Sequence, residues 1–105
     1  MDQGQYPSYQ FFAEHLNALF QISIAADKVV EVKLVEVSEL KLSPHQERYS
    51  IVFKGPRDTF LLQDNYSMTH ETGGTFSIFL VPVGMEGDGY LYESVSNQLL
   101  AAEGK

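Results

Sequence analysis

The fold class is decided by the stretch Phe76-Ser77-Ile78-Phe79-Leu80-Val81-Pro82-Val83-Gly84, which a turn at Gly87-Asp88-Gly89 follows. Side chains alternate between the two faces of a strand, so this stretch carries large apolar groups on both faces, and both require burial. Pro82 has no amide to donate and is therefore expected at a strand end or an edge. The segment Tyr90-Leu91-Tyr92-Glu93-Ser94-Val95 comes after the turn and predicts the second strand of a hairpin.

A second long β segment, from Lys28 to Leu42, changes its apolar parity along the way. Val30, Val32 and Leu34 share one face, whereas Val35 and Val37 fall on the other, and Leu40 and Leu42 return to the first. One extra residue in a strand turns all later side chains to the opposite face, so a β-bulge explains the change. A strand that is apolar on both faces explains it as well, and the sequence leaves both interpretations open.

Turns at Ser43-Pro44-His45-Gln46, Gly55-Pro56-Arg57-Asp58 and Gly73-Gly74 separate the remaining apolar segments. Glycine and proline at these places interrupt regular structure. Together with a strand that begins at residue 21, the pattern predicts antiparallel β structure over residues 21–96, as a barrel or sandwich of about six strands. The short segments are Tyr49–Phe53, Phe60–Leu62 and Tyr66–His70.

The first element is predicted to be an amphipathic helix over residues 8–20, with Ser8 as its N-cap. We expect this helix to cover the outer face of the Thr75–Val83 strand, because it is the one amphipathic cover that the pattern offers. Residues 97–105 are expected to form a short tail. The apolar stripe of the helix consists of Tyr9, Phe12, Leu16, Leu19 and Phe20.

Length and composition favour one acidic domain over residues 1–105. The chain has 105 residues, 44% of them hydrophobic and none of them cysteine, and its net charge is -7. A core of this size folds without disulfides, and the charge repels nucleic acid and anionic membrane surfaces. Residues 1–7 resemble no signal peptide, and no apolar run reaches the ~20 residues of a membrane helix. We therefore expect a cytoplasmic protein, unless a partner carries it elsewhere.

No group of residues has the spacing that catalysis or metal binding requires. His15, His45 and His70 come from three different elements, and Asp64, Ser67 and His70 resemble a catalytic triad by residue type alone. The sequence also lacks a phosphate-binding loop and a dinucleotide fingerprint. We expect no enzymatic activity, no metal site and no cofactor.

Polar residues within the apolar strands are the remaining candidates for a site. Burying such groups is costly unless they bond one another, tie strand ends to turns or line a functional pocket. We favour a structural network, in which a buried Glu93 faces His70, over a functional pocket. The six candidates are Gln63, Tyr66, His70, Tyr92, Glu93 and Asn97.

Four motifs in order resemble an uncharacterised bacterial domain family of about 100 residues, a domain of unknown function. They are Phe53-Lys54-Gly55-Pro56, the Gln63…Tyr66…His70 segment, Phe79-Leu80-Val81-Pro82 and Tyr92-Glu93-Ser94-Val95-Ser96-Asn97. Asp64-Asn65 and Ser96 depart from the family pattern, which has a glycine-containing pair and an aromatic residue there. The family resembles proteins met alongside phage-tail-collar-type genes. The resemblance therefore implies an assembly role.

Two functions remain open from the sequence. The first is a non-enzymatic protein-interaction or assembly module, an accessory of a phage-tail-like or surface structure, whose partner is another protein chain. This interpretation also leaves room for a homo-oligomer. The second is a carrier of a small apolar ligand, because a compact barrel with many tyrosines can line a pocket. The tyrosines are Tyr6, Tyr9, Tyr49, Tyr66, Tyr90 and Tyr92.

Overall fold

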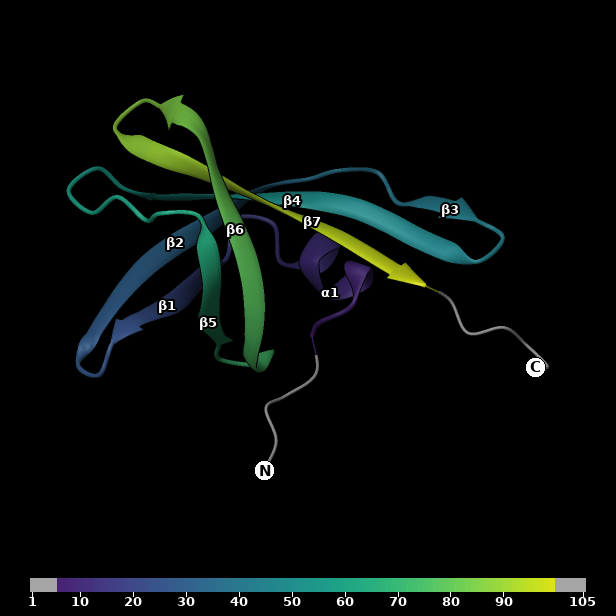
Figure 1. The fold of residues 1–105 in the computed structure, drawn as a ribbon, viewed down its shortest axis with the longest axis horizontal. Coiled ribbons are helices and arrows are strands. Elements are labelled where there is room, and N and C mark those ends of the chain that lie inside the picture. The colour runs from purple at the N-terminus through teal and green to yellow at the C-terminus, as the bar shows by residue number, and fades with distance from the viewer. Residues whose placement is uncertain (1–5, 100–105) are drawn as a thin grey trace.

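A computed structural model, which describes residues 6–99, shows a closed barrel of six antiparallel strands with one extra strand and one short helix (Figure 1). The sheet order is β2-β1-β5-β6-β7-β4-β3, and an additional pairing of β2 with β4 closes the circuit. The expected mainly β fold of about six strands is confirmed, in the barrel form. The elements are α1 (Tyr9–Glu14), β1 (Leu19–Ala25), β2 (Lys28–Val37), β3 (Lys41–Ser43), β4 (Gln46–Pro56), β5 (Asp64–His70), β6 (Gly74–Glu86) and β7 (Gly89–Leu99).

Two strands, β2 and β6, change their neighbour halfway along. The first part of β2 pairs with β1, the pairing with β4 begins at Lys33, and within that pairing the register shifts between Leu34 and Glu36. Val35 is the extra residue, so the bulge interpretation of the parity change is confirmed. In β6 the pairing with β5 ends at Leu80, and the pairing with β7 has its own shift between Pro82 and Gly84. Pro82 thus lies at a bulge where β5 no longer accompanies the strand.

The interior of the barrel is filled by the inward side chains of all six strands. The loop between β4 and β5 closes one end, with Leu61 buried and its amide donating to the Tyr92 hydroxyl at 2.9 Å. Residues 60–62 were expected to be a strand, and this expectation is wrong, because the Leu61 amide bonds to a side chain instead of a neighbouring strand. The fully buried side chains include Phe12, Phe20, Ile22, Leu34, Ile51, Phe53, Met68, Leu80 and Tyr92.

The helix is much shorter than the predicted 8–20. Ser8 is its N-cap, as expected, and accepts from the Phe11 amide at 3.1 Å, but the helix ends at Glu14. Asn17 has a φ of 77°, and its amide donates to the Leu34 carbonyl at 2.7 Å. This left-handed residue turns the chain into β1, so backbone pairing with β2 overrides the helical periodicity of the sequence. Leu19 and Phe20 consequently belong to β1.

The helix also lies on a different side of β6 than expected. Phe12 has no exposed surface, and its ring centroid is 6.2 Å from that of Phe76, which is one of the inward residues of β6. The outward Phe79 is 44% exposed. Thus α1 closes the barrel at the end where β4 begins and β7 finishes, as Figure 1 shows, and it does not cover the outer face.

The last strand continues beyond the predicted limit of 96. In β7 the pairing with β4 reaches Leu99, which lies opposite Gln46. Residues 97–99 are therefore strand, and the rest of the expected tail, 100–105, lies outside the described residues. Among residues 6–99, no helix has the length and apolar character to cross a membrane.

The helix supplies the first test of this architecture. Phe12→Ala should lower the free energy of unfolding by about 3–5 kcal/mol, because it empties a fully buried aromatic site. Leu16→Ala, two residues past the helix and 46% exposed, should change it by less than about 0.5 kcal/mol. Urea unfolding of both variants measures the difference. Equal losses in the two variants would contradict the packing described.

Candidate functional site

The predicted polar residues near the β4–β5 loop fix that loop to the barrel. The Tyr66 hydroxyl donates to the Leu62 carbonyl, and the Tyr92 hydroxyl accepts from the Leu61 amide. Burial raises the pKa of Tyr92, while the Leu61 amide acts against this rise. Gln63 is exposed in the same loop. These contacts tie strands to a loop.

His70 lies at the opposite end of the barrel and holds the β5–β6 turn. Its Nδ1 accepts from the Thr72 amide at 3.0 Å and from the Gly73 amide at 3.2 Å, which places the proton of the neutral ring on Nε2. The ring packs among aromatic neighbours, with Phe11 at 5.2 Å and His15 at 4.8 Å between centroids. Burial, and then His15, lower the pKa of His70.

Glu93 and Asn97 lie on the outward side of β7. Glu93 is half-buried between Val52 of β4 and Val81 of β6, and the Asn97 side chain accepts from Gln46. Glu93 does not face His70, so that part of the expectation is wrong. Within residues 6–99, no two of the six predicted residues are bonded to each other. The structure therefore distributes them over both ends and the outside of the barrel.

Near the helix end lies a group of hydroxyls whose two tyrosines, Tyr6 and Tyr49, were among the six that the sequence suggested for a pocket, whereas its two serines were missed. Ser94 and Ser96 are buried on the inward face of β7, beside the phenols of Tyr6 and Tyr49. Burial, and then Tyr49, raise the pKa of Tyr6, whereas the two serine hydroxyls lower it. The alternation that places Tyr92 inward also places both serines inward. The position of Tyr6, which precedes α1, has no such signal.

These tyrosine and serine hydroxyls lie beside the place where the pairing of β6 with β7 stops. We call this place the seam. The β6–β7 ladder ends at the pair Val81–Glu93, whereas the β4–β7 ladder continues to Leu99. Beyond Glu93 the two strands diverge, as Figure 1 shows. Each therefore has one backbone edge without a neighbouring strand within the described residues. A cleft of about 240 Å³ lies there, lined by Tyr6, Ser77, Ile78, Phe79, Ser94, Val95, Ser96 and Asn97.

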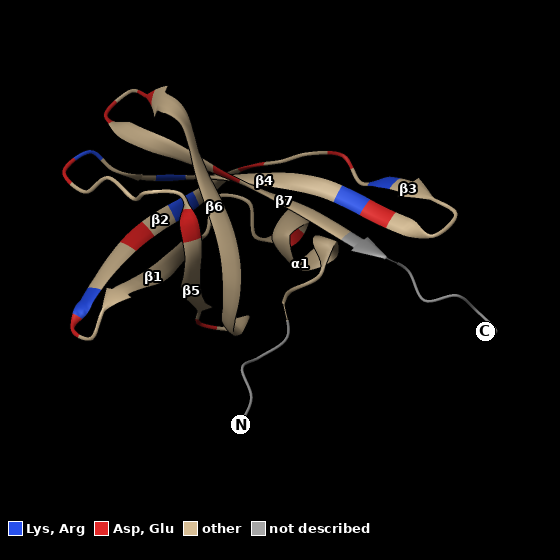
Figure 2. Ribbon diagram, viewed as in Figure 1, with Lys and Arg blue, Asp and Glu red and all other residues tan. Residues whose placement is uncertain are grey.

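The edges of the seam carry no charge. Between Gly74 and Leu80, and again between Ser94 and Leu99, the sequence has no Lys, Arg, Asp or Glu. Figure 2 shows the charged residues on β2, β3, β4, β5 and β7 and at the turns, while β1 is uncharged and β6 is uncharged as far as its last residue. Natural edge strands are usually protected by charges, short length or a covering segment. No charged residue protects the two edges of the seam.

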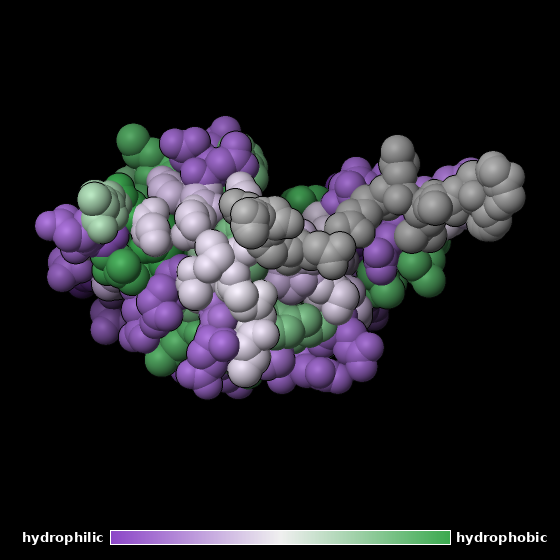
Figure 3. Space-filling model, turned by 90° about the horizontal axis from the view of Figure 1, so that it is seen from below, coloured by the Kyte–Doolittle hydropathy of each residue, from purple (hydrophilic) through white to green (hydrophobic). Residues whose placement is uncertain are grey.

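Exposed apolar side chains accompany the seam on both sides. Phe79 projects from β6, and Val95, 53% exposed, projects from β7. On the face drawn in Figure 3, apolar side chains lie in several separate patches between hydrophilic ones. A surface of this mixed kind fits a contact with one strand better than it fits a broad hydrophobic interface.

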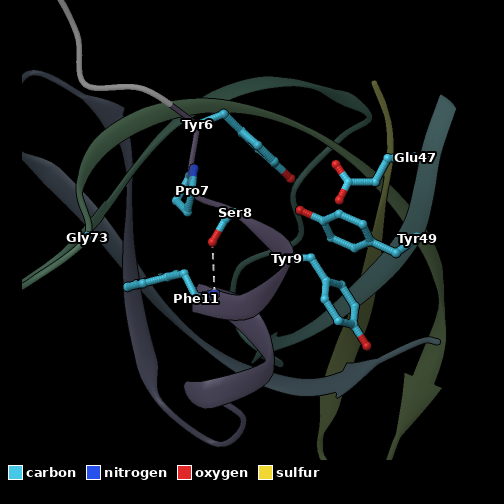
Figure 4. A pocket seen from close by; sticks show the side chains of 8 residues that line it. All are labelled: Tyr6, Pro7, Ser8, Tyr9, Phe11, Glu47, Tyr49 and Gly73. Carbon is cyan, nitrogen blue, oxygen red and sulfur yellow. Dashed lines mark hydrogen bonds between the residues drawn. The ribbon is translucent and has the colours of Figure 1, made fainter. Parts of the chain in front are cut away.

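A second hollow, the tyrosine pocket, adjoins the seam and shares Tyr6 with it. It has a volume of about 440 Å³ and is open to the surface. Figure 4 shows the hydroxyls of Tyr6 and Tyr49 directed toward each other, with the carboxylate of Glu47 beside them. Gly73 forms part of the wall beside Phe11. A side chain does not fit there, because a Cβ at this position would come within 2.6 Å of the Phe11 ring. The lining residues are Tyr6, Pro7, Ser8, Tyr9, Phe11, Glu47, Tyr49 and Gly73.

Residues 6–99 contain no group of three or more His, Cys, Asp or Glu side chains that is placed to hold a metal ion. The fold and its hollows define a small antiparallel β-barrel with a helix at one end and a strand seam beside it. A family model described as a domain of unknown function, DUF6916, matches residues 7–96, and the chain belongs to this family. No curated protein and no solved structure matches the chain.

Hydrogen exchange tests the seam in the free protein. The amides of β7 that face away from β4, every second one from Ser94 to Gln98, should exchange at least about tenfold faster than those from Tyr90 to Glu93, which have strands on both sides. Residue-resolved exchange by NMR measures this. Uniformly slow exchange over the whole of β7 would show that the edge is already covered.

The buried His70 predicts a pH dependence of stability. Its pKa is lowered in the folded state from the ordinary 6.5, so the unfolded chain takes up the proton more readily. Stability should therefore be highest above this value and fall as the pH drops through the lowered pKa. His15 and Glu71 are the titratable neighbours. His70→Asn should show a weaker fall between pH 7.5 and 5, whereas the exposed His45→Asn should match the unaltered protein. Thermal unfolding from pH 7.5 to 5 measures this dependence. Identical pH profiles of stability in the unaltered protein and both variants would contradict the prediction.

Proposed function

We propose that this domain is a non-enzymatic protein-interaction module that receives an extended strand of another chain at the seam. The observation that carries the proposal is a pair of long, uncharged backbone edges that no described strand covers. Unpaired amides and carbonyls on a strand edge are a template for strand addition. The incoming strand would extend the sheet along β7.

The side chains beside the edge would give the contact its selectivity. In strand addition, backbone hydrogen bonds supply affinity, and side chains at alternate positions supply specificity. Phe79 and Val95 offer apolar contacts to outward residues of the incoming strand. Cross-strand pairs of this kind each contribute roughly 0.2–1 kcal/mol. The partner is a different chain, because two copies that each carry a net charge of -7 repel one another.

An assembly setting, such as the phage-tail-like or surface structure that the resemblance implies, would supply neighbouring chains with free strands. The alternative function, an apolar-ligand carrier, has less support. The inward positions of the barrel are occupied by buried side chains, and the tyrosine pocket is an open hollow with a carboxylate in its wall. An apolar ligand there would leave that carboxylate poorly solvated.

Selection of extended peptides on the immobilised domain, from a display library with segments of about eight residues, tests strand addition. Selected peptides should shift the NMR resonances of residues 94–99 and 75–80 and protect the seam amides from exchange. Val95→Lys should weaken their binding at least about tenfold, because it places a charge at the edge.

Val29→Lys is the matched control for this substitution. Val29 is 57% exposed on the outside of β2, far from the seam, and it has the same residue type and a similar environment to Val95. Peptide binding to Val29→Lys should equal that of the unaltered protein. If selected peptides bind both lysine variants equally, or shift only residues outside β6 and β7, strand addition at the seam is wrong.

A further inference from the structure

We propose that the tyrosine pocket binds an organic cation, the alkylammonium or alkylguanidinium group of a basic side chain on the partner strand. The inference rests on the proposed function for the source of that side chain. The preference for a cation is argued from the residues of the pocket alone. The pocket adjoins the seam through Tyr6, so a strand at the β7 edge runs past its opening.

Aromatic rings form about half of the wall. Tyr9 and Tyr49 pack edge to face with centroids 4.9 Å apart, and Phe11 closes the side next to Gly73. The Tyr9 hydroxyl donates to the Ser38 carbonyl at 3.0 Å, so this ring is held in place. Aromatic rings attract cations through their quadrupole, and the attraction increases when water is partly excluded.

Glu47 gives the pocket a negative charge. It is half-buried at the start of β4, on the same side of the strand as Tyr49, whereas Arg48 between them is exposed. Within residues 6–99 the one ion pair joins Lys54 to Asp88 at 3.7 Å, so Glu47 has no cationic partner there. Burial, with the charge of Glu47 adding to it, raises the pKa of Tyr49 and keeps that phenol neutral. One carboxylate among neutral phenols leaves a net negative pocket.

The alternatives fit less well. An anion would meet the Glu47 carboxylate and the net charge of -7. A neutral apolar group would remove water from the carboxylate without replacing its interactions. A cation with a short alkyl stem satisfies both features of the wall, because its stem lies on the rings and its charged head reaches the carboxylate.

Titration with n-butylammonium and n-butylguanidinium tests the pocket without the unknown partner, with n-butanol and butyrate as matched neutral and anionic probes. NMR shifts of Tyr6, Tyr9 and Tyr49 should saturate with at least one cation, and the two controls should leave them unchanged. Glu47→Gln should weaken cation binding by about fivefold or more. Glu36→Gln makes the same change in net charge at an exposed position on β2, and it should leave cation binding unaltered.

Thermal unfolding of both glutamine variants establishes that they are folded before the titrations are compared. No saturable shift with either cation, equal binding of n-butanol, or equal weakening by the two variants would each overturn the inference. Peptides selected on the domain then test whether the bound cation comes from a basic side chain of the added strand. Replacing their basic residue by norleucine should weaken binding about fivefold and restore native shifts at Tyr49. Should strand addition fail while butylammonium still binds, the pocket recognises a free cation and the partner assignment is wrong.

Discussion

The change of neighbour along β2 and β6 is the constraint on which the rest of the structure depends. In each of these strands a different neighbour is paired in the second half, and a bulge, at Val35 in β2 and beside Pro82 in β6, lies within the new pairing, where it bends the strand. In β2 the change closes the barrel against β4. In β6 the ladder with β7 stops at the pair Val81–Glu93, so beyond Glu93 the edge of β7 that faces away from β4 has no neighbouring strand among the described residues.

The aromatic core adapts to this geometry at the end where the seam opens. Diverging strands leave a space that strand side chains alone do not fill, and Phe12 occupies it from the helix. Tyr6 packs against both Phe12 and Phe76, with centroids 5.7 and 5.6 Å apart, and turns its hydroxyl toward the serines of β7. The short segment before β1 is thus part of the core, and it also builds the wall that the seam and the tyrosine pocket share.

Charge separates the surface of the domain into two kinds. Acidic residues at the turns and on several strands give the domain its net charge of -7, while the edges of the seam have only backbone groups and uncharged side chains. Recognition of backbone alone discriminates poorly between strands. In the proposed contact, a single carboxylate beside the seam, next to neutral phenols, would add discrimination because it would favour strands with a basic residue at one position.

The class of fold and the places of most turns follow from the sequence alone, because alternation and turn chemistry are local properties, whereas the bulge in β2 was one of two interpretations until the register decided it. The Ser8 cap was equally local. The length of the helix was not, since the apolar spacing from Tyr9 to Phe20 is helical and only pairing with β2 directs Leu19 and Phe20 into a strand. The inward side of β6 and the dispersal of His70, Tyr92 and Glu93 also depended on how the strands close. Residues far apart in the chain, Tyr6, Glu47 and Tyr49, meet in the pocket because a barrel brings them together, and no spacing in a sequence records that distance.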